Sequence, residues 1–397
     1  MTLHIPEPAL EARQDTVLPP SAGAGQRVVL YTSSDCWRGA GISFVNIARG
    51  LERHGYAPHV LSMCREVTEE FAHAGVPVSA VPRGDHESWR LHRFLNASDA
   101  CALIVDRAHD LRVGALAVVA TRAALINRYN HFRPKPPTDL LVRAAYRTVL
   151  RELVFLSSSA RQRVLREVGF MRAVPSTTIY EGIDVTQFRS CPAAATEFRT
   201  AFEIGGEPFL LAVGALAPEK RYDMLFDAVS QLGEAAPLLV VCGEGPEERR
   251  LRRRAEALHV RTRFLGRIPQ SDLVGAYNAA LALIHVGDVE TFGLAVLEAM
   301  ACGRPVIASA GGALPEVVGT DDECGTLVPV ASTLAISDAI RHVISRPDEA
   351  TRMGWRARER ARARFSVVAM EDAYAALVSR HAAVRSASRA RGESRAP

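Results

Sequence analysis

Apolar and polar positions alternate along the chain in a recurring pattern. Short apolar runs bounded by glycine or proline are each followed by a stretch with helical spacing, which is typical of a parallel sheet with crossover helices. In the first half the runs are 27–32, 58–63, 76–81, 102–106, 124–128, 153–157 and 177–180. In the second half they are 209–213, 238–242, 263–265, 281–286, 305–308 and 326–328. The pattern predicts an α/β protein with two units of about six strands each.

Helical spacing and its interruptions predict the domain organisation. The segment 222–232 places its apolar residues on one face, as a helix that covers a sheet does. The strand and helix pattern breaks near Arg189–Thr200, where Pro192 follows Cys191. We therefore expect a first domain over 26–195, a second over 196–365 and a last helix within 366–380. The polar segments 1–25 and 381–397 lack apolar periodicity, which predicts disordered tails.

Composition excludes several classes of protein. The chain has 397 residues and a formal net charge of +4, which is too weak to indicate a nucleic-acid partner. No apolar run approaches the ~18–20 residues of a membrane-spanning helix, and residues 1–26 lack the apolar core of a signal peptide. The seven cysteines are scattered and form no C-x-x-C pair. This favours reduced thiols and a cytoplasmic location over a disulfide scaffold or a zinc finger.

The basic residues are almost all arginine. Only Lys135 and Lys220 of the 48 basic residues are lysines, so a site that uses a lysine is conspicuous. Two arginine-rich helical segments, 246–258 and 355–364, could bind a polyanion or could form solvated helix faces with Glu–Arg pairs. We favour the solvated faces, which are the commoner meaning of such charge patterns.

The segment 285–308 carries most of the candidate chemistry. A buried strand ends at Val286, a polar loop runs to Gly293, and a helix follows as far as Gly303. In open α/β sheets ligands bind at the carboxyl ends of the strands, where this loop lies. The first amides of the helix and its dipole form a ready anion site there. The sequence therefore predicts an anion-binding site in this loop.

Two glutamates flank the predicted anion site. Glu290 precedes the helix, and Glu298 lies about 7.5 Å along its axis at 1.5 Å per residue. Carboxylates accept hydrogen bonds from sugar hydroxyls, so an elongated ligand with a central diphosphate and a hydroxylated ring at each end would fit. The spacing alone leaves open that both glutamates are plain surface charges.

Glu290-x7-Glu298, followed by Ala-Met-Ala-Cys-Gly-Arg-Pro-Val-Ile-Ala, resembles the signature of a known family. It is similar to the E-x7-E motif of retaining, family-4-type glycosyltransferases of the GT-B fold, the glycosyl transferases group 1. Further segments resemble this family in order and spacing: 179–188, 213–221, 241–246, 264–267, 311–318 and 325–329. The resemblance covers roughly residues 26–380 and is most specific over 177–330.

The resemblance implies a fold and roles for the helix start. The fold would consist of two facing Rossmann-like domains, with the helix in 366–380 packing back on the first. Glu290 would contact hydroxyls of the donor sugar, and Glu298 the ribose of the nucleotide. The backbone amides of Phe292, Gly293 and Leu294 would hold the diphosphate.

The phosphate loop matches the family with one departure. Gly214 and Lys220 stand at the family's positions, but Ala215 takes the place where the family usually has an arginine. Arg221 is the candidate substitute. Gly266 would lie near the nucleobase.

The first domain would bind the acceptor. Gly41 ends a glycine-containing loop after the first strand. Phe44 stands where a G-x-G-x-x-G motif would have its third glycine, which counts against a dinucleotide site. His109 and His131 follow two strands and are candidates for the histidine that family members often carry near the reacting carbon. The choice between Asn130 and His131 for that place stays open. The acceptor-side candidates are Gly41, Arg107, Asp110 and Asn130.

The implied activity is a retaining transfer of a sugar from a nucleotide-diphosphate sugar to an acceptor hydroxyl. No D-x-D motif is present, so we expect no metal and no cofactor beyond the nucleotide-sugar co-substrate. The acceptor could be a small molecule, a glycan or a lipid; a soluble metabolite or glycan is favoured because no basic amphipathic helix stands out. The alternatives are a nucleotide-sugar 2-epimerase of the same fold and a non-catalytic sugar-nucleotide-binding protein.

Overall fold

A computed structural model of the chain describes residues 25–37, 39–130, 140–320 and 323–393. All thirteen strands that the hydrophobic pattern predicts are present, and they form two parallel sheets. No helix in these ranges is both long enough and apolar enough to cross a membrane. All seven cysteines lie in the described ranges and are free thiols.

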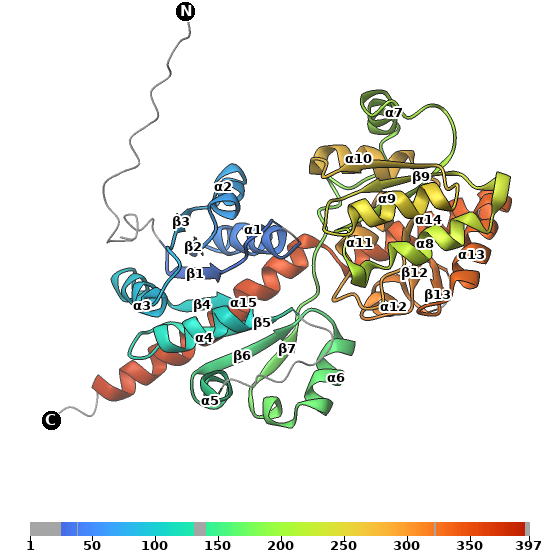
Figure 1. The fold of residues 1–397 in the computed structure, drawn as a ribbon. Helices are drawn as coiled ribbons and strands as arrows, with labels where there is room; N and C mark the ends of the chain where they lie inside the picture. Colours follow the sequence, from blue (N-terminus) through green and yellow to red (C-terminus); the bar gives the residue numbers. More distant parts are fainter. Residues whose placement is uncertain (1–24, 38, 131–139, 321–322, 394–397) are drawn as a thin grey trace, which may run out of the picture. The chain divides into compact units, whose positions relative to one another are not determined.

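The first sheet has seven strands in the order β3-β2-β1-β4-β5-β6-β7 (Figure 1). Its interior strand β1 is buried at all six positions and pairs in parallel with β2 and β4. The bounds are β1 (Arg27–Thr32), β2 (Ala57–Ser62), β3 (Val78–Ala80), β4 (Ala102–Val105), β5 (Ala124–Tyr129), β6 (Leu150–Phe155) and β7 (Ser176–Thr178).

Helices alternate with these strands. In the first helix Phe44, Ile47 and Leu51 are buried at helical spacing, so one stripe of the helix faces the core. The bounds are α1 (Gly39–Arg53), α2 (Arg65–His73), α3 (Glu87–Ala97), α4 (Ala108–Ala117), α5 (Leu140–Thr148), α6 (Ser158–Glu167) and the 3₁₀ turn Gly169–Ala173.

The second sheet has six strands in the order β10-β9-β8-β11-β12-β13. Successive residues of β8 point to different cores: Phe209 and Leu211 belong to one buried cluster, and Leu210 and Ala212 to another. The strand is therefore apolar throughout, as expected for a sheet covered on both faces. The bounds are β8 (Phe209–Val213), β9 (Leu238–Cys242), β10 (Thr262–Gly266), β11 (Ala282–His285), β12 (Val306–Ser309) and β13 (Thr326–Val328).

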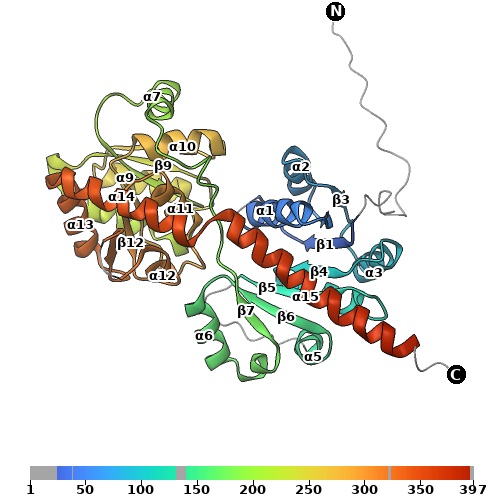
Figure 2. The ribbon, with the colours of Figure 1, turned by 180° about the vertical axis from the view of Figure 1, so that it is seen from behind.

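Helices cover both faces of the second sheet. Figure 1 shows α8 and α9 on one face, and Figure 2, from behind, shows α14 on the other. The bounds are α7 (Pro192–Ala201), α8 (Tyr222–Ser230), α9 (Glu248–Ala257), α10 (Gln270–Ala279), α11 (Leu294–Ala301), α12 (Leu314–Val318), α13 (Thr333–Ser345), α14 (Pro347–Arg364) and α15 (Val367–Glu393), with 3₁₀ turns at Pro218–Lys220 and Gly233–Ala235.

The chain divides into two compact units. The first comprises residues 1–127, 137–152 and 375–397, and the second 128–136 and 153–374. The second unit thus includes α6 and β7, because Glu316 of α12 accepts hydrogen bonds from the amides of Ser158 and Ser159, both at 3.0 Å. The expected domain boundary between residues 195 and 196 stays a prediction.

Two segments contain helix where the sequence predicted none. Residues 192–201, expected to be a break, form α7 with Pro192 in its first turn, a place where proline costs no hydrogen bond. The last helix continues to Glu393 and so occupies most of the segment expected to be a disordered tail. Alanine and arginine, which dominate that segment, are strong helix formers.

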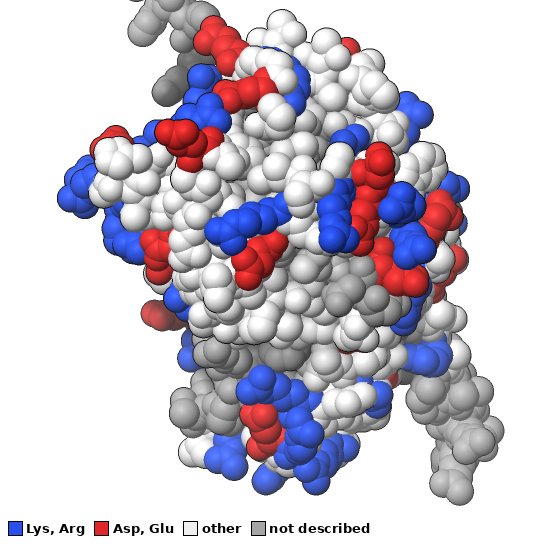
Figure 3. Space-filling view, turned by 90° about the vertical axis from the view of Figure 1, so that its right-hand side faces the viewer, with Lys and Arg blue, Asp and Glu red and all other residues white. Residues whose placement is uncertain are grey.

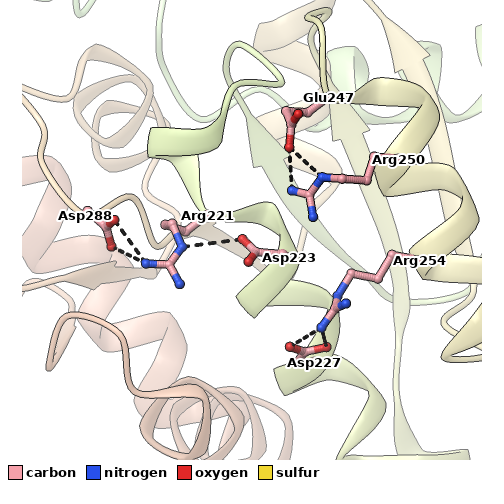
Figure 4. A network of polar contacts seen from close by, with 7 residues as sticks. All are labelled: Arg221, Asp223, Asp227, Glu247, Arg250, Arg254 and Asp288. Atoms are coloured by element: carbon pink, nitrogen blue, oxygen red, sulfur yellow. Dashed lines mark hydrogen bonds and ion pairs between the residues drawn. The ribbon is translucent and has the colours of Figure 1, made fainter.

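The arginine-rich helix α9 confirms the expected solvated face. Arg250 pairs with Glu247, and Arg252 with Glu248 at 2.8 Å, while Arg254 binds Asp227 of α8 (Figure 4). Acidic and basic side chains also lie side by side on the face drawn in Figure 3. Three of the five arginines of this helix are thus paired with carboxylates.

Candidate active site

The loop after β8 presents the conspicuous lysine. The loop leaves the strand at Gly214, whose φ is +148°, and the Tyr222 hydroxyl donates a hydrogen bond to the Gly214 carbonyl at 3.1 Å. Lys220 ends a 3₁₀ turn, and Arg221, with φ +52°, precedes α8. The turn and the tyrosine together hold the loop that carries Lys220 at the carboxyl end of β8.

Lys220 contacts Glu290, which lies in the loop after β11, a neighbour of β8 in the sheet. The ammonium of Lys220 forms a short ion pair with Glu290 Oε2, and His285 Nε2 donates to the same oxygen at 2.8 Å. The Thr291 amide donates to Oε1 at 3.2 Å. Because β8 and β11 are parallel neighbours, the loops after them begin at the same edge of the sheet. The structure thus brings two predicted site residues together and adds His285.

The ion pair determines the protonation state of Glu290. Burial alone would raise the pKa of its carboxyl group, but the Lys220 charge and the His285 hydrogen bond outweigh burial. The pKa of Glu290 is therefore held well below its ordinary value, and the carboxylate stays ionised near neutral pH.

Helix α11 starts directly behind Glu290. Gly293 precedes the helix with φ +96°, a conformation that glycine adopts without strain, and a Cβ there would lie 2.6 Å from the Leu314 side chain. The first intrahelical bond runs from Leu297 N to Gly293 O at 3.0 Å, so the amides of Leu294 and the next two residues have no partner within the helix. Phe292 is buried in the core beneath the loop.

Glu298 lies within α11 in a different environment. It is 7% exposed, and the Tyr277 hydroxyl of α10 donates to its Oε2 at 2.6 Å. Burial raises the pKa of Glu298 to about 7, although the tyrosine hydrogen bond lowers it. Near neutral pH the carboxyl group of Glu298 is therefore partly protonated, whereas that of Glu290 is ionised and only accepts hydrogen bonds.

Arg221 is already paired. Its Nη1 donates to both carboxylate oxygens of Asp288, at 2.8 and 3.0 Å, and its Nε lies 3.5 Å from Asp223 Oδ1 (Figure 4). These two carboxylates hold the pKa of Arg221 above its ordinary value. To bind a phosphate in place of the missing arginine at position 215, Arg221 must first exchange these partners.

A glycine turn supports the loop that carries Glu290. The Ala313 amide donates to the Glu290 carbonyl at 2.9 Å. A Cβ on Gly312, whose φ is +64°, would lie 2.0 Å from that carbonyl oxygen. The segment 311–313 therefore fits the loop only with glycine at this position.

Sequence reasoning missed three residues that support the two glutamates: His285, Tyr277 and Gly312. His285 had a usable signal, because it is the one polar residue of the apolar run 281–286 and stands next to the end of that run. Tyr277 had no usable signal, because its contact with Glu298 joins two helices. Gly266, expected near the nucleobase, ends β10 with φ +68°, and its carbonyl accepts a hydrogen bond from Gly243 N at 2.7 Å.

The acceptor-side candidates of the first unit lie after β1 and β4. His109 Nε2 binds Glu87 Oε2 at 2.8 Å, and Arg107 donates to the Ser34 hydroxyl at 3.3 Å. Asp110 is fully buried and accepts a hydrogen bond from Ser33 N at 3.1 Å. Burial, together with the charge of nearby Asp106, raises the pKa of Asp110 well above its ordinary value. Asp110 thus fixes the loop after β1.

Three candidates of the first half remain: Gly41, Asn130 and His131. Gly41 lies in the first turn of α1, where a Cβ would be 2.7 Å from the Trp37 ring, so close packing explains this glycine. Asn130 follows β5 and is half-buried. His131 lies outside the described residues. Among the residues that are described, no group of three or more His, Cys, Asp or Glu is placed to hold a metal ion.

Solved structures resemble this chain over most of its length. The HepE structure from Anabaena in complex with UDP-glucose superposes with a TM-score of 0.79 at 19% identity, covering 89% of this chain and 99% of that one. A sucrose-phosphate synthase from Thermosynechococcus elongatus gives 0.77 at 21% identity, covering 90% and 100%. At such low identity these likenesses support the fold, which is GT-B.

Curated relatives share part of the sequence. A GDP-mannose-dependent α-(1-6)-phosphatidylinositol monomannoside mannosyltransferase from Mycolicibacterium smegmatis is 31% identical over 227 residues, 52% of this chain and 58% of the relative. A D-inositol 3-phosphate glycosyltransferase from Saccharomonospora viridis is 36% identical over 204 residues, 48% and 46% of the two chains. The chain thus matches about half the length of these relatives.

The family comparison covers the unit that holds Lys220 and Glu290. Residues 195–360 match the glycosyl transferases group 1 family, and this range includes both residues, Glu298 and the whole six-stranded sheet. The geometry of the site, the GT-B fold and this match agree with the resemblance seen in the sequence. Residues 195–360 are therefore similar in sequence to the glycosyl transferases group 1, within a chain that has the GT-B fold.

Proposed function

We propose that the chain is a retaining, metal-independent glycosyltransferase that moves a sugar from a nucleotide-diphosphate sugar to an acceptor hydroxyl. The observation that carries the proposal is the ion pair between Lys220 and Glu290 beside the first turn of α11. A cation, a carboxylate and free helix amides at one sheet edge match the phosphates and hydroxyls of such a donor.

The resting ion pair would exchange when the donor binds. The Lys220 ammonium would move from Glu290 to the diphosphate, and the freed carboxylate would accept hydrogen bonds from the sugar. His285 would keep the carboxylate in place during this exchange, because its hydrogen bond to Oε2 does not depend on the lysine. Glu298 would bind the ribose hydroxyls.

In the transfer step the bond between the anomeric carbon and the diphosphate oxygen breaks. A bond from the acceptor oxygen forms on the same face of the sugar, and the acceptor's proton passes to a diphosphate oxygen. The sugar has oxocarbenium character between these events. Lys220 and the amides of Gly293 and Leu294 would stabilise the charge on the leaving diphosphate, the role that a metal ion has elsewhere.

The names of relatives direct the choice of substrates. The mannosyltransferase relative uses GDP-mannose and an inositol lipid by its name, another relative is named for inositol 3-phosphate, and HepE was solved with UDP-glucose. GDP-mannose and UDP-glucose are thus the first donors to test, and inositol compounds the first acceptors. Residues 26–195 would bind the acceptor and 196–365 the donor, in the cytoplasm, where nucleotide sugars are made.

The proposal is tested with a panel of nucleotide sugars, each supplied with and without an acceptor. Slow hydrolysis of one donor, and transfer with retained anomeric configuration, support the proposal. Interconversion of sugars would identify the epimerase, and binding without turnover a sugar-nucleotide-binding protein. Addition of EDTA should leave the rate unchanged.

The variant Lys220→Gln tests the site itself. We expect kcat to fall about 100- to 1,000-fold, as on removal of one group that stabilises transition-state charge. Glu219→Gln is the matched control, because it changes an exposed side chain next to Lys220. If Lys220→Gln keeps the activity of the control, the lysine has no role in the transfer.

A further inference from the structure

A second cavity lies at the other end of the second sheet. It has a volume of about 210 Å³ and is lined by Leu281 and Pro305, which directly precede β11 and β12. Glu290 follows the carboxyl end of β11, so this cavity is at the amino ends of the strands. It is therefore distinct from the proposed donor site.

Close packing of two helices places two arginines on this cavity. A Cβ on Gly354 of α14 would lie 2.2 Å from the carbonyl oxygen of Gly303, so the α14 backbone almost touches the end of α11. Arg358 lies one turn after Gly354, and its Cδ is 3.9 Å from the position of a Cβ on Gly303. Arg304 is the next residue after Gly303. Both arginines line the cavity.

Neither arginine forms an ion pair with any residue in the described part of the chain. Arg304 Nε is buried without a hydrogen-bond partner, and its Nη1 reaches the Ala280 carbonyl at 3.5 Å, a long contact. Burial lowers the pKa of Arg304. Arg221 and Arg254 of the same unit, by contrast, each bind a carboxylate (Figure 4). A partly buried, unpaired cation favours an anion nearby.

We propose that this cavity binds a small phosphate monoester with an apolar body. Its lining contains two arginines and no acidic residue, and two positive charges match the −1.5 to −2 of such a phosphate near pH 7. The guanidinium fork fits phosphate oxygens. Trp355, which is 61% exposed, and Val343 and Pro347 supply apolar surface for the rest of the ligand.

The binding of phenyl phosphate to the full-length chain, measured by titration calorimetry, tests this proposal. We expect binding by the wild type, and at least ~10-fold weaker binding by Arg304→Gln and by Arg358→Gln, since each loses a charge-assisted hydrogen bond. Arg352→Gln is the matched control: it is an exposed arginine of the same helix outside the lining. Circular dichroism establishes that each variant is folded. If Arg304→Gln does not fold, Arg358→Gln alone tests the proposal.

The outcome is independent of the donor site. Glu290→Gln should bind phenyl phosphate as the wild type does, whatever its transfer activity. Unchanged affinity in both arginine variants, or a loss of affinity in Arg352→Gln, would overturn the proposal. Co-sedimentation with phosphatidylcholine vesicles that contain phosphatidic acid, if it requires Arg304 and Arg358, would identify a lipid as the source of the phosphate.

Discussion

Glu290 and Glu298 belong to one sequence motif, yet their surroundings change the pKa of each carboxyl group in opposite directions. Glu290 lies beside Lys220 and His285, and its pKa is lowered. Glu298 faces the Tyr277 hydroxyl in an otherwise apolar core, and burial raises its pKa to about 7. One residue is thus a permanent anion, whereas the other changes charge near neutral pH.

The raised pKa of Glu298 makes stability depend on pH. Its folded-state pKa of about 7 exceeds the ordinary 4.5, so the protonated carboxyl stabilises the fold below pH 4.5. That contribution is lost as pH rises from 4.5 through 7, up to about 3 kcal/mol. We expect the wild type to lose free energy of unfolding relative to Glu298→Gln over this window, as measured by urea unfolding at several pH values. A constant difference between the two proteins from pH 4 to 8 would contradict the expectation.

At the scale of elements, the site depends on loops that are held by other loops. The segment between β11 and α11 is bound to the turn at 311–313 through the Glu290 carbonyl. The 3₁₀ turn before Arg221 supports the same segment, because Asp288 N donates to the Glu219 carbonyl at 3.1 Å. Both contacts are made by backbone atoms, so they tolerate change in most side chains but not in Gly312.

The substitution Gly312→Ala tests this support. The added methyl group would meet the Glu290 carbonyl in a backbone conformation that disfavours alanine, so we expect the free energy of unfolding to fall by about 1–3 kcal/mol. Donor affinity, measured by calorimetry, should fall with it because Glu290 moves. Gly206→Ala is the control, since a Cβ there has nothing within 4 Å. Equal stability of the two variants would show that the turn does not hold the loop.

At the scale of the whole molecule, the proposed donor contacts belong to one compact unit. Lys220, Glu290 and Glu298 all lie in residues 153–374, whereas His109 and Gly41 belong to the other unit. Binding of the donor through its diphosphate and sugar hydroxyls would therefore stabilise the second unit more than the first unit.

Hydrogen exchange followed by mass spectrometry tests this division. With saturating UDP or GDP we expect added protection in peptides covering 213–222 and 285–300, because ligand contacts suppress local opening there. Peptides of β1 and β2 should exchange as in the free protein. Protection confined to the first unit would contradict the assignment of the donor to residues 196–365.

The sequence predicted much of the fold and proposed the residues of the candidate site, but it did not predict which side chains they contact. The alternation of apolar runs and helical stretches placed every strand, because buried parallel strands need continuous apolar runs. The pattern did not predict the helix α7, where Pro192 begins a helix and does not interrupt one. It also missed the end of α15, which is rich in arginine and has no apolar periodicity. The pairing of Arg221 with Asp288 had no sequence signal, since 67 positions separate the two residues.

The sequence by itself therefore determined the α/β class, the two sheets and the chemistry offered by Lys220, Glu290 and Glu298. These features are local, because a period of two or 3.6 residues and a helix start are each defined by neighbours in the chain. Only the tertiary structure decided which charges meet. It joined Lys220 to Glu290, buried Glu298 beside Tyr277 and left Arg304 and Arg358 without an acidic partner. Such contacts depend on the order of strands in the sheet and on helix packing, which bring together residues far apart in the chain.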